Sequence, residues 1–471
     1  MPSASTLVRA SIVILASSVP AFAAPQSLQT YGTETPGTGG VAPEIWALGS
    51  PYVGNTQFAV RLERALANST AFLLVGTQKV DVPSSFHINV LPFFLTPGLP
   101  TGPAGSLLLP LPIPPLPAIQ GARAYLQWAV SDPIPAFGTS ASKGLESGLT
   151  DVPLAVSVGS SSVASTVDVN AGTVGTWPAI GTHPSDVEFT PDGSLAVVPS
   201  DSGGVYHVVD VAANGAILAS VPVNGRPNAV AITPDGKRCY GASYGSSGAQ
   251  SGEIVEIDID PASATFGTIV GNVAIGGTVS QFEGASISED GRVLVAASLG
   301  LGQPSWLVAV DIDPQSPGYN QVFRAATGSG LWTDVVPSPD GSLAYLTQAN
   351  IGPGSTVLVY DLSTGLPIGG VGNVGDFATD IDISHDGRVV WVATPNSSSI
   401  ARIVVDPSDP AYLQPATAPV PSPFSLALTP DETEVWAAEQ SGSMHRLDAA
   451  TLTPIQSYPT TPNAGNGIAV R

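Results

Sequence analysis

The stretch ITPDGKRCYG, residues 232–241, joins the end of one apolar strand to the start of another through a tight turn. Pro presets φ for a turn, Asp hydrogen-bonds its own backbone and Gly accepts a positive φ, so Pro-Asp-Gly between apolar runs predicts a β-hairpin. Because turn geometry explains the Asp, we assign it no function. Five further stretches have the same shape: FTPDGSLAVV (189–198), ISEDGRVLVA (287–296), PSPDGSLAYL (337–346), ISHDGRVVWV (383–392) and LTPDETEVWA (428–437).

Two more strands are expected after each hairpin. A third strand ends in Asp, as VYHVVD does at Asp210, and a fourth apolar run follows, as in ILASVPV (217–223). The turn aspartates are 43 to 55 residues apart. A repeat of about this length with four strands is typical of a β-propeller blade.

A seventh blade is divided between two distant segments. The segment that starts at Leu154 supplies strands two to four, and NGIAV (466–470) resembles a first strand. Joining them closes the ring without an open sheet edge. We therefore expect an all-β fold with a seven-bladed propeller over residues 154–471, closed by the C-terminal strand.

The run RPNAVAITPDGKRCYGAS (226–243) resembles the YVTN-type repeat of exported bacterial seven-bladed propellers, which are related in shape to lactonase-like propellers. The resemblance covers about residues 154–471 and implies the propeller fold. It does not carry an activity, because one fold hosts many functions.

Residues 25–150 predict a separate small β-sandwich. FAVRL (58–62) alternates apolar and other side chains, as a half-buried strand does. The prolines of LLLPLPIPPLP (107–117) cannot donate ladder hydrogen bonds, so this segment fits an edge strand or a polyproline-like stretch. Together with YGTETPGTGG (31–40), the strands resemble a small β domain that recurs in exported bacterial proteins.

The N-terminus has the pattern of a cleaved secretory signal over residues 1–23. Arg9 precedes a short apolar stretch, and Ala21-Phe22-Ala23 provides small residues at a cleavage site. We expect a secreted, periplasmic or cell-surface protein with no membrane insertion after cleavage. Cys239 is the single cysteine, which excludes an intrachain disulfide, c-type haem attachment and a cysteine zinc site.

The charge limits the class of partner. The chain has 15 Lys and Arg against 37 Asp and Glu, a net charge of −22. Such a chain repels phosphate backbones, so we expect no nucleic-acid partner. A protein, a glycan or a small ligand remains, with no required cofactor except a possible Ca²⁺ site, and we expect a monomer.

Candidate binding residues lie before each hairpin, where loops between successive blades meet at the central channel. Aromatic residues there can stack on a sugar or simply fill the channel mouth. The rim positions are Ser185, Asn228, Trp332, Phe377 and Phe424, which precede turn aspartates, and Asn466 in the closing strand.

Two kinds of chemistry fit neighbouring positions. His183, Arg226 and Glu283 could serve as base, anion clamp and acid for a lactone or ester, although no Gly-x-Ser-x-Gly elbow is present. Crowded carboxylates could instead bind Ca²⁺, or could be solvated or accept backbone N–H groups. The metal candidates are Asp186, Glu283, Asp334 and Asp380.

The sequence thus predicts an exported binding platform whose loop face takes a protein, glycan or small ligand. A lactonase-like hydrolase at the channel mouth is the alternative, and a purely structural envelope component is a third possibility.

Overall fold

The computed structural model describes residues 28–48, 51, 58–82, 88–103, 105–114, 122–133, 135, 138–149, 154–169, 171–245, 252–275, 279, 281–300, 304–350, 354–461 and 465–471. The expected signal at residues 1–23 lies outside this part of the chain. Strands dominate, accompanied by the short 3₁₀ turns η1 (Thr38–Gly40) and η3 (Pro395–Ser397). The all-β prediction is confirmed.

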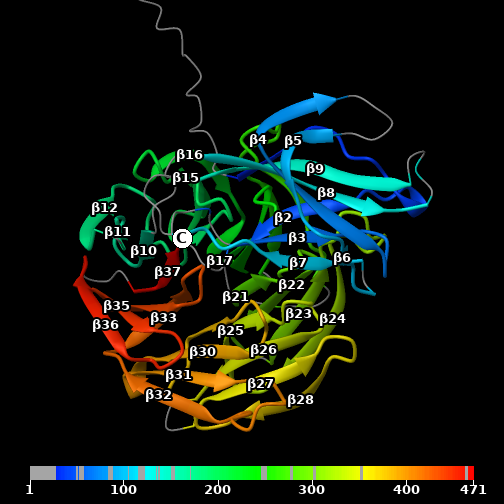
Figure 1. The fold of residues 1–471 in the computed structure, drawn as a ribbon. Coiled ribbons are helices and arrows are strands. Elements are labelled where there is room, and N and C mark those ends of the chain that lie inside the picture. Colours follow the sequence, from blue (N-terminus) through cyan, green and yellow to red (C-terminus); the bar gives the residue numbers. More distant parts are fainter. Residues whose placement is uncertain are drawn as a thin grey trace, which may run out of the picture.

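The repeats form four-stranded antiparallel sheets, of which the described residues contain seven (Figure 1). Sheet 1 contains β13 (Glu188–Phe189), β14 (Leu195–Ser200), β15 (Val205–Asp210) and β16 (Ala216–Pro222); sheet 2 contains β17 (Gly225–Ile232), β18 (Arg238–Gly245), β19 (Ile254–Asp258) and β20 (Thr268–Asn272); sheet 3 contains β21 (Phe282–Ile287), β22 (Val293–Ser298), β23 (Ser305–Asp311) and β24 (Gln321–Gly328). Sheet 4 contains β25 (Leu331–Pro337), β26 (Leu343–Ala349), β27 (Thr356–Asp361) and β28 (Leu366–Val371); sheet 5 contains β29 (Asp380–Ile383), β30 (Val389–Thr394), β31 (Ser399–Val404) and β32 (Pro415–Pro419); sheet 6 contains β33 (Pro423–Leu428), β34 (Glu434–Glu439), β35 (Ser443–Asp448) and β36 (Pro454–Pro459); sheet 7 contains β10 (Leu154–Val158), β11 (Ala164–Asp168), β12 (Thr173–Trp177) and β37 (Gly467–Val470).

The first strand of each sheet lies at the centre of the ring. These inner strands contact one another in cyclic order, from β13 through β17, β21, β25, β29 and β33 to β37, which contacts β13 again. The C-terminal strand β37 pairs antiparallel with β10, with Ala155 opposite Val470 and Val158 opposite Gly467. Figure 1 shows the red C-terminal strand beside the teal β10. The ring is therefore closed by pairing the two ends of the repeat region.

A hydroxyl two residues before each turn aspartate fixes the hairpin. In sheet 1, Thr190 donates to Asp192 Oδ1 at 2.5 Å, and the same oxygen accepts the backbone N–H of Ser194 at 3.0 Å. This explains why the repeat has a small polar residue at that position. The equivalent pairs are Thr233–Asp235, Ser288–Asp290, Ser338–Asp340, Ser384–Asp386 and Thr429–Asp431.

The turn proline and glycine also pack sheets against each other. Gly387 has φ +70°, and a Cβ there would lie 2.8 Å from Cδ of Pro339 in the preceding sheet. The last repeat has Glu432 at the glycine position, also left-handed at φ 52°. Its carboxylate accepts the backbone N–H of His385 in sheet 5, so this departure from the repeat adds a contact between sheets.

The N-terminal part is built from two sheets around one core. The larger sheet contains β1 (Leu28–Tyr31), β9 (Thr139–Gly148), β8 (Arg123–Ser131), β4 (Thr70–Val82), β5 (Ile88–Leu95) and β6 (Leu99–Pro100), and the smaller contains β2 (Glu44–Leu48), β3 (Ala59–Glu63) and β7 (Leu107–Pro110). Val60 and Leu62 from the smaller sheet share a buried cluster with Trp128 from the larger one. β7 pairs only with β3, so the edge-strand prediction for the proline-rich segment is confirmed for its described residues.

The front part, as we call these two sheets, packs on the propeller face that carries the Pro-Asp-Gly turns (Figure 1). Arg64 pairs with Asp313 at 3.3 Å, and Glu63 pairs with Arg292 at 3.4 Å. Both contacts join the smaller front sheet to sheet 3. The boundary between the front part and the propeller, expected near residue 150, stays a prediction. It lies between the end of β9 at Gly148 and the start of β10 at Leu154.

Candidate functional site

Five polar and aromatic residues converge on the opposite face, where the sequence placed the binding loops. Arg226 at the start of β17 forms a bidentate ion pair with Asp201 of sheet 1 at 2.5 Å, and its guanidinium lies 5.6 Å from the ring centre of Tyr244. The Tyr244 hydroxyl donates to Glu283 Oε2 at 2.6 Å, and the Asn228 amide donates to the same oxygen at 3.2 Å. We call these five residues the rim cluster.

Burial sets the electrostatics of the rim cluster. Burial raises the pKa of Glu283 above the ordinary carboxyl value, while the hydrogen bonds from Tyr244 and Asn228 oppose that shift. Burial, with the nearby Glu283, also raises the pKa of the Tyr244 phenol, so this hydroxyl stays a donor. Arg226 keeps 56% of its side chain exposed and can reach a ligand.

His183 does not join this cluster. It is exposed, has a left-handed φ of 52°, and contributes its backbone carbonyl as an acceptor for the N–H of Asp201. Its imidazole has no hydrogen bond to Arg226 or Glu283 in the part of the chain described. Of the three predicted catalytic candidates, the structure therefore brings together Arg226 and Glu283.

One of the aromatic residues predicted at the rim is buried in the core. Trp332 is 1% exposed and packs edge-on against Tyr360 with ring centres 5.8 Å apart, so it belongs to the core between sheets 3 and 4 and cannot contact a ligand. Its position before the turn aspartate predicted a place at the rim, but its side chain is buried between sheets 3 and 4. Phe377 and Phe424 are half-buried, and their place at the rim stays a prediction.

Ser185 and Asn228 connect neighbouring sheets. The Ser185 hydroxyl donates to the carbonyl of Asn228 at 2.9 Å, and the Asn228 amide donates to the carbonyl of Glu283 at 3.0 Å. Thr333 and Thr379, at equivalent positions, donate to carbonyls of the following sheets at 2.8 and 2.7 Å. Asn466 in the closing segment donates its backbone N–H to Val158.

The carboxylates of the inner strands accept the backbone N–H groups of the next sheet. Asp186 accepts from Val230 at 3.2 Å, Asp334 from Ile381 at 3.1 Å, and Asp380 from Leu426 at 2.8 Å. Two further carboxylates do the same, Glu188 toward Ile232 and Asp382 toward Leu428. We call these side chain to backbone contacts between sheets the latches.

The latches account for most of the predicted metal ligands. Burial raises the pKa of Asp186 to about 6 and raises the pKa values of Asp334 and Asp380, whose side chains hydrogen-bond each other. In the described ranges, no three His, Cys, Asp or Glu side chains are grouped to hold a metal ion. The calcium site stays a prediction, and Asp186, Asp334 and Asp380 are held as acceptors of backbone N–H groups.

Glu283 differs from the hydroxyl and amide residues at its position in the repeat. Ser185, Asn228, Thr333 and Thr379 share its position in the repeat and all donate to the next sheet, which an ionised carboxylate cannot do. Glu283 instead accepts from residues of the preceding sheet. The sequence signal for this site is therefore a carboxylate at a position where four of the other five repeats have a donor.

Two members of the rim cluster were missed by counting. Tyr244 lies near the end of β18, opposite Arg226 in the strand register, and Asp201 follows β14. Neither occupies the counted positions before the turn. A strand alignment of Arg226 with Tyr244 would have been needed to find them.

Comparisons with known proteins support the fold. No family model matches the sequence, and no curated protein matches it significantly. A structure of hydrazine synthase from Kuenenia stuttgartiensis has a TM-score of 0.51 at 20% identity, covering 61% of this chain and 90% of that one. Candidate 6-phosphogluconolactonases from Bacteroides fragilis and Bacteroides uniformis each have a TM-score of 0.52, at 18% and 17% identity, covering 68% of this chain and 98% and 99% of theirs. At such identities the likeness shows a β-propeller fold alone.

No helix in the described ranges is long and apolar enough to cross a membrane.

Proposed function

We propose that this protein is an exported binding platform and that the rim cluster binds a glycan or another polyhydroxylated ligand. The observation that carries the proposal is the environment of Glu283. Its carboxylate accepts hydrogen bonds from Tyr244 and Asn228 of the preceding sheet, whereas the equivalent residues of four other repeats donate to the next sheet. Its carboxylate can accept ligand hydroxyl groups, and the exposed guanidinium of Arg226 can donate to ligand oxygens. The half-buried Tyr244 ring adds an aromatic surface.

A glycan array with the mature protein tests the proposal. We expect at least one saccharide to bind, and Arg226→Ala to weaken calorimetric affinity about tenfold, as expected for loss of a charged hydrogen bond. Tyr244→Phe, which removes only the hydroxyl, should have a smaller effect. Arg388→Ala is the matched control, because Arg388 is 66% exposed and lies beside a hairpin turn on the other face. Absence of any bound saccharide, or equal binding by all variants, would reject the rim cluster as a glycan site.

A lactone or ester hydrolase is the second candidate. It is favoured by burial of Glu283, which raises the pKa of this carboxyl above its ordinary value as suits a general acid, and by the exposed guanidinium of Arg226, which can stabilise negative charge that develops on a ligand. Turnover of a lactone panel tests it. Hydrolysis that falls by about 100-fold or more in Glu283→Gln would favour the hydrolase over the binding platform.

We also propose that the protein is exported. Mass spectrometry of the protein recovered outside the cytoplasm should show a mature chain that begins after Ala23 or Ala24. Recovery of only the uncleaved chain would contradict export with cleavage.

A further inference from the structure

A cavity of about 650 Å³ lies on the propeller face opposite the rim cluster. Its walls come from β2 and β9 of the front part and from the hairpin turns of sheets 1, 2 and 3. Small-molecule sites commonly have volumes of roughly 300–1,000 Å³ and favour junctions between domains. The size and position of this cavity are those of a ligand site.

The walls of the cavity are fixed by contacts between the two parts. Arg64 bridges Glu44 at 3.5 Å and Asp313 at 3.3 Å, so one guanidinium joins β2 to sheet 3. Trp46 packs over Gly291, where a Cβ would lie 3.3 Å from the indole. Because Trp46 is only partly buried and lines the cavity, one aromatic surface is held in place for a ligand ring.

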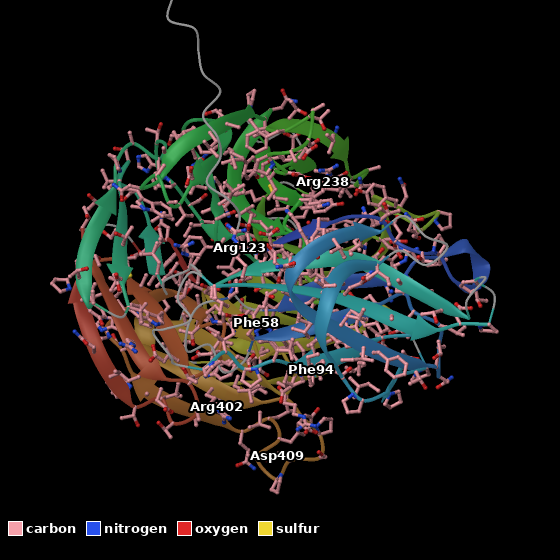
Figure 2. All side chains as sticks on the ribbon, turned by 45° about the horizontal axis from the view of Figure 1, so that its top comes forward. Phe58, Phe94, Arg123, Arg238, Arg402 and Asp409 are labelled. Carbon is pink, nitrogen blue, oxygen red and sulfur yellow. The ribbon has the colours of Figure 1, made fainter. Side chains whose placement is uncertain are left out.

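Basic side chains are concentrated in this cavity. The whole chain has 15 Lys and Arg, and five of them line the cavity: Arg64, Lys143, Lys237, Arg238 and Arg292. Figure 2 labels Arg238 where the green strands of sheet 2 approach the blue strands of the front part. Seven carboxylates line the same cavity, namely Glu34, Glu44, Asp192, Asp235, Asp260, Asp290 and Asp313, so its walls offer both cations for a ligand carboxylate and acceptors for ligand hydroxyl groups.

The two lysines have the fewest close carboxylate partners of these five groups. Arg238 is paired with Asp258 at 2.7 Å and Arg292 with Glu63 at 3.4 Å, so the arginines already have close carboxylates. Lys143 is 47% exposed and meets Glu34 only at 3.8 Å, and Lys237 has no ion pair with any described residue. Lys143 comes from the front part and Lys237 from sheet 2, so they reach the cavity from opposite walls.

The lining also provides hydroxyl acceptors. Asp235 is exposed, and its Oδ1 accepts from Thr233 and from the backbone of Lys237. A carboxylate has further acceptor capacity, which suits ligand hydroxyl groups.

We propose that this cavity binds a small saccharide that carries a carboxylate. Lys143 and Lys237 receive the ligand carboxylate, Trp46 packs against the sugar ring, and Asp235 accepts a ring hydroxyl. This site is separate from the rim cluster and does not depend on the function proposed there.

Calorimetry with matched sugar pairs tests the proposal. D-glucuronate and D-galacturonate are titrated against the mature protein, with D-glucose and D-galactose as neutral partners that lack the carboxylate. We expect a uronate to bind at least about tenfold more tightly than its neutral partner, and Lys143→Ala and Lys237→Ala each to weaken it about tenfold. Trp46→Ala should weaken both members of a pair.

Two control variants show whether the uronate binds in this cavity or elsewhere on the protein. Lys79→Ala removes a 57% exposed lysine that is absent from the cavity lining, and Arg226→Ala disables the rim cluster; both should bind the uronate as the wild type does. No uronate binding by the wild type would overturn the proposal. Uronate binding that is unchanged in the Lys143→Ala/Lys237→Ala double variant would overturn it as well, and loss in Arg226→Ala alone would assign the uronate to the rim cluster.

Discussion

Asp186 shows a structural role for the carboxylates that recur in this propeller. Its Oδ2 accepts the N–H of Val230, a backbone donor on the inner edge of sheet 2 that has no strand beside it. A buried donor without a partner is costly, so the carboxylate stabilises the neighbouring sheet. Gly467 leaves room for it, because a Cβ there would lie 2.6 Å from the Asp186 Cα.

The pKa of Asp186 predicts a pH effect on stability. Burial raises this pKa to about 6, so the folded state keeps a proton that the unfolded state loses near its ordinary pKa of 3.8. The free energy of unfolding of the wild type should therefore fall between about pH 4 and pH 6, relative to Asp186→Asn, by up to about 3 kcal/mol at 1.36 kcal/mol per pH unit. Urea denaturation at pH 4, 5, 6 and 7 measures it.

Asp361 provides a control of opposite sign. The hydrogen bond from Ser363 lowers the pKa of this turn carboxyl, so its stabilisation is present above the unfolded pKa and is lost as the pH falls below it. Asp361→Asn should therefore lose stability relative to the wild type at pH 7 but not in acid. A pH profile of Asp186→Asn parallel to that of the wild type would contradict the role of Asp186 as a buried latch.

At the scale of elements, β37 is the strand that completes the ring. It supplies the inner strand of sheet 7 by pairing with β10, and it also contacts β13 and β33. Ile468 is 6% exposed there, in a cluster with Trp436 of sheet 6. The closing strand therefore packs on both neighbouring sheets.

Truncation within β37 tests this role. Ile468→Ala should lower the free energy of unfolding by about 2–4 kcal/mol through lost burial and the cavity left behind. Ile455→Ala is the control, because Ile455 on β36 is 48% exposed and its loss should change stability by less than about 0.5 kcal/mol. Deletion of residues 465–471 should lower the melting temperature sharply, and an unchanged melt would show that the ring does not depend on β37.

The spacing of the repeats in the sequence predicted the strands of the propeller correctly, but it did not predict the roles of their side chains. Six Pro-Asp-Gly-type turns at regular spacing determine the strand order, and the segment at Leu154 determines the closure. Asp186 and Glu283 are carboxylates six and seven residues before their turn aspartates, so counting back from the turn made both of them metal candidates. Their different partners depend on neighbouring sheets, which counting along one repeat cannot give.

On the scale of the whole molecule, ion pairs join the front part to sheet 3. Glu63 is 2% exposed and accepts from Arg61 at 2.6 Å and Arg292 at 3.4 Å, while Arg61 lies 3.8 Å from Glu289. Only 11% of the chain is charged, so this concentration at one junction is a marked feature. The sequence did not predict it, because the residues are more than 200 positions apart and share no repeat.

Glu63→Gln should weaken this junction. Removing the buried negative charge leaves two arginines without their shared partner, and we expect a loss of about 2–4 kcal/mol in unfolding free energy. Hydrogen exchange should increase in β2 and β3 more than in sheets 5 and 6. Lys79→Gln removes a 57% exposed cation from Glu146, which keeps its ion pair with Arg123, so stability should change by less than about 1 kcal/mol. Equal effects of the two variants would mean that the junction ion pairs contribute little.

Our central claim is that the propeller binds a ligand at the rim cluster and does not consume it. The most direct measurement is the melting temperature of the wild type and of Arg226→Ala over one panel of saccharides and lactones, with product analysis of each sample. A ligand that binds only the folded state raises stability, by about 2.7 kcal/mol at 100 times Kd. We predict a saccharide-dependent rise in the wild type that is reduced in Arg226→Ala, with no product formed. Lactone hydrolysis that Glu283→Gln abolishes, without any saccharide-dependent rise, would contradict this claim.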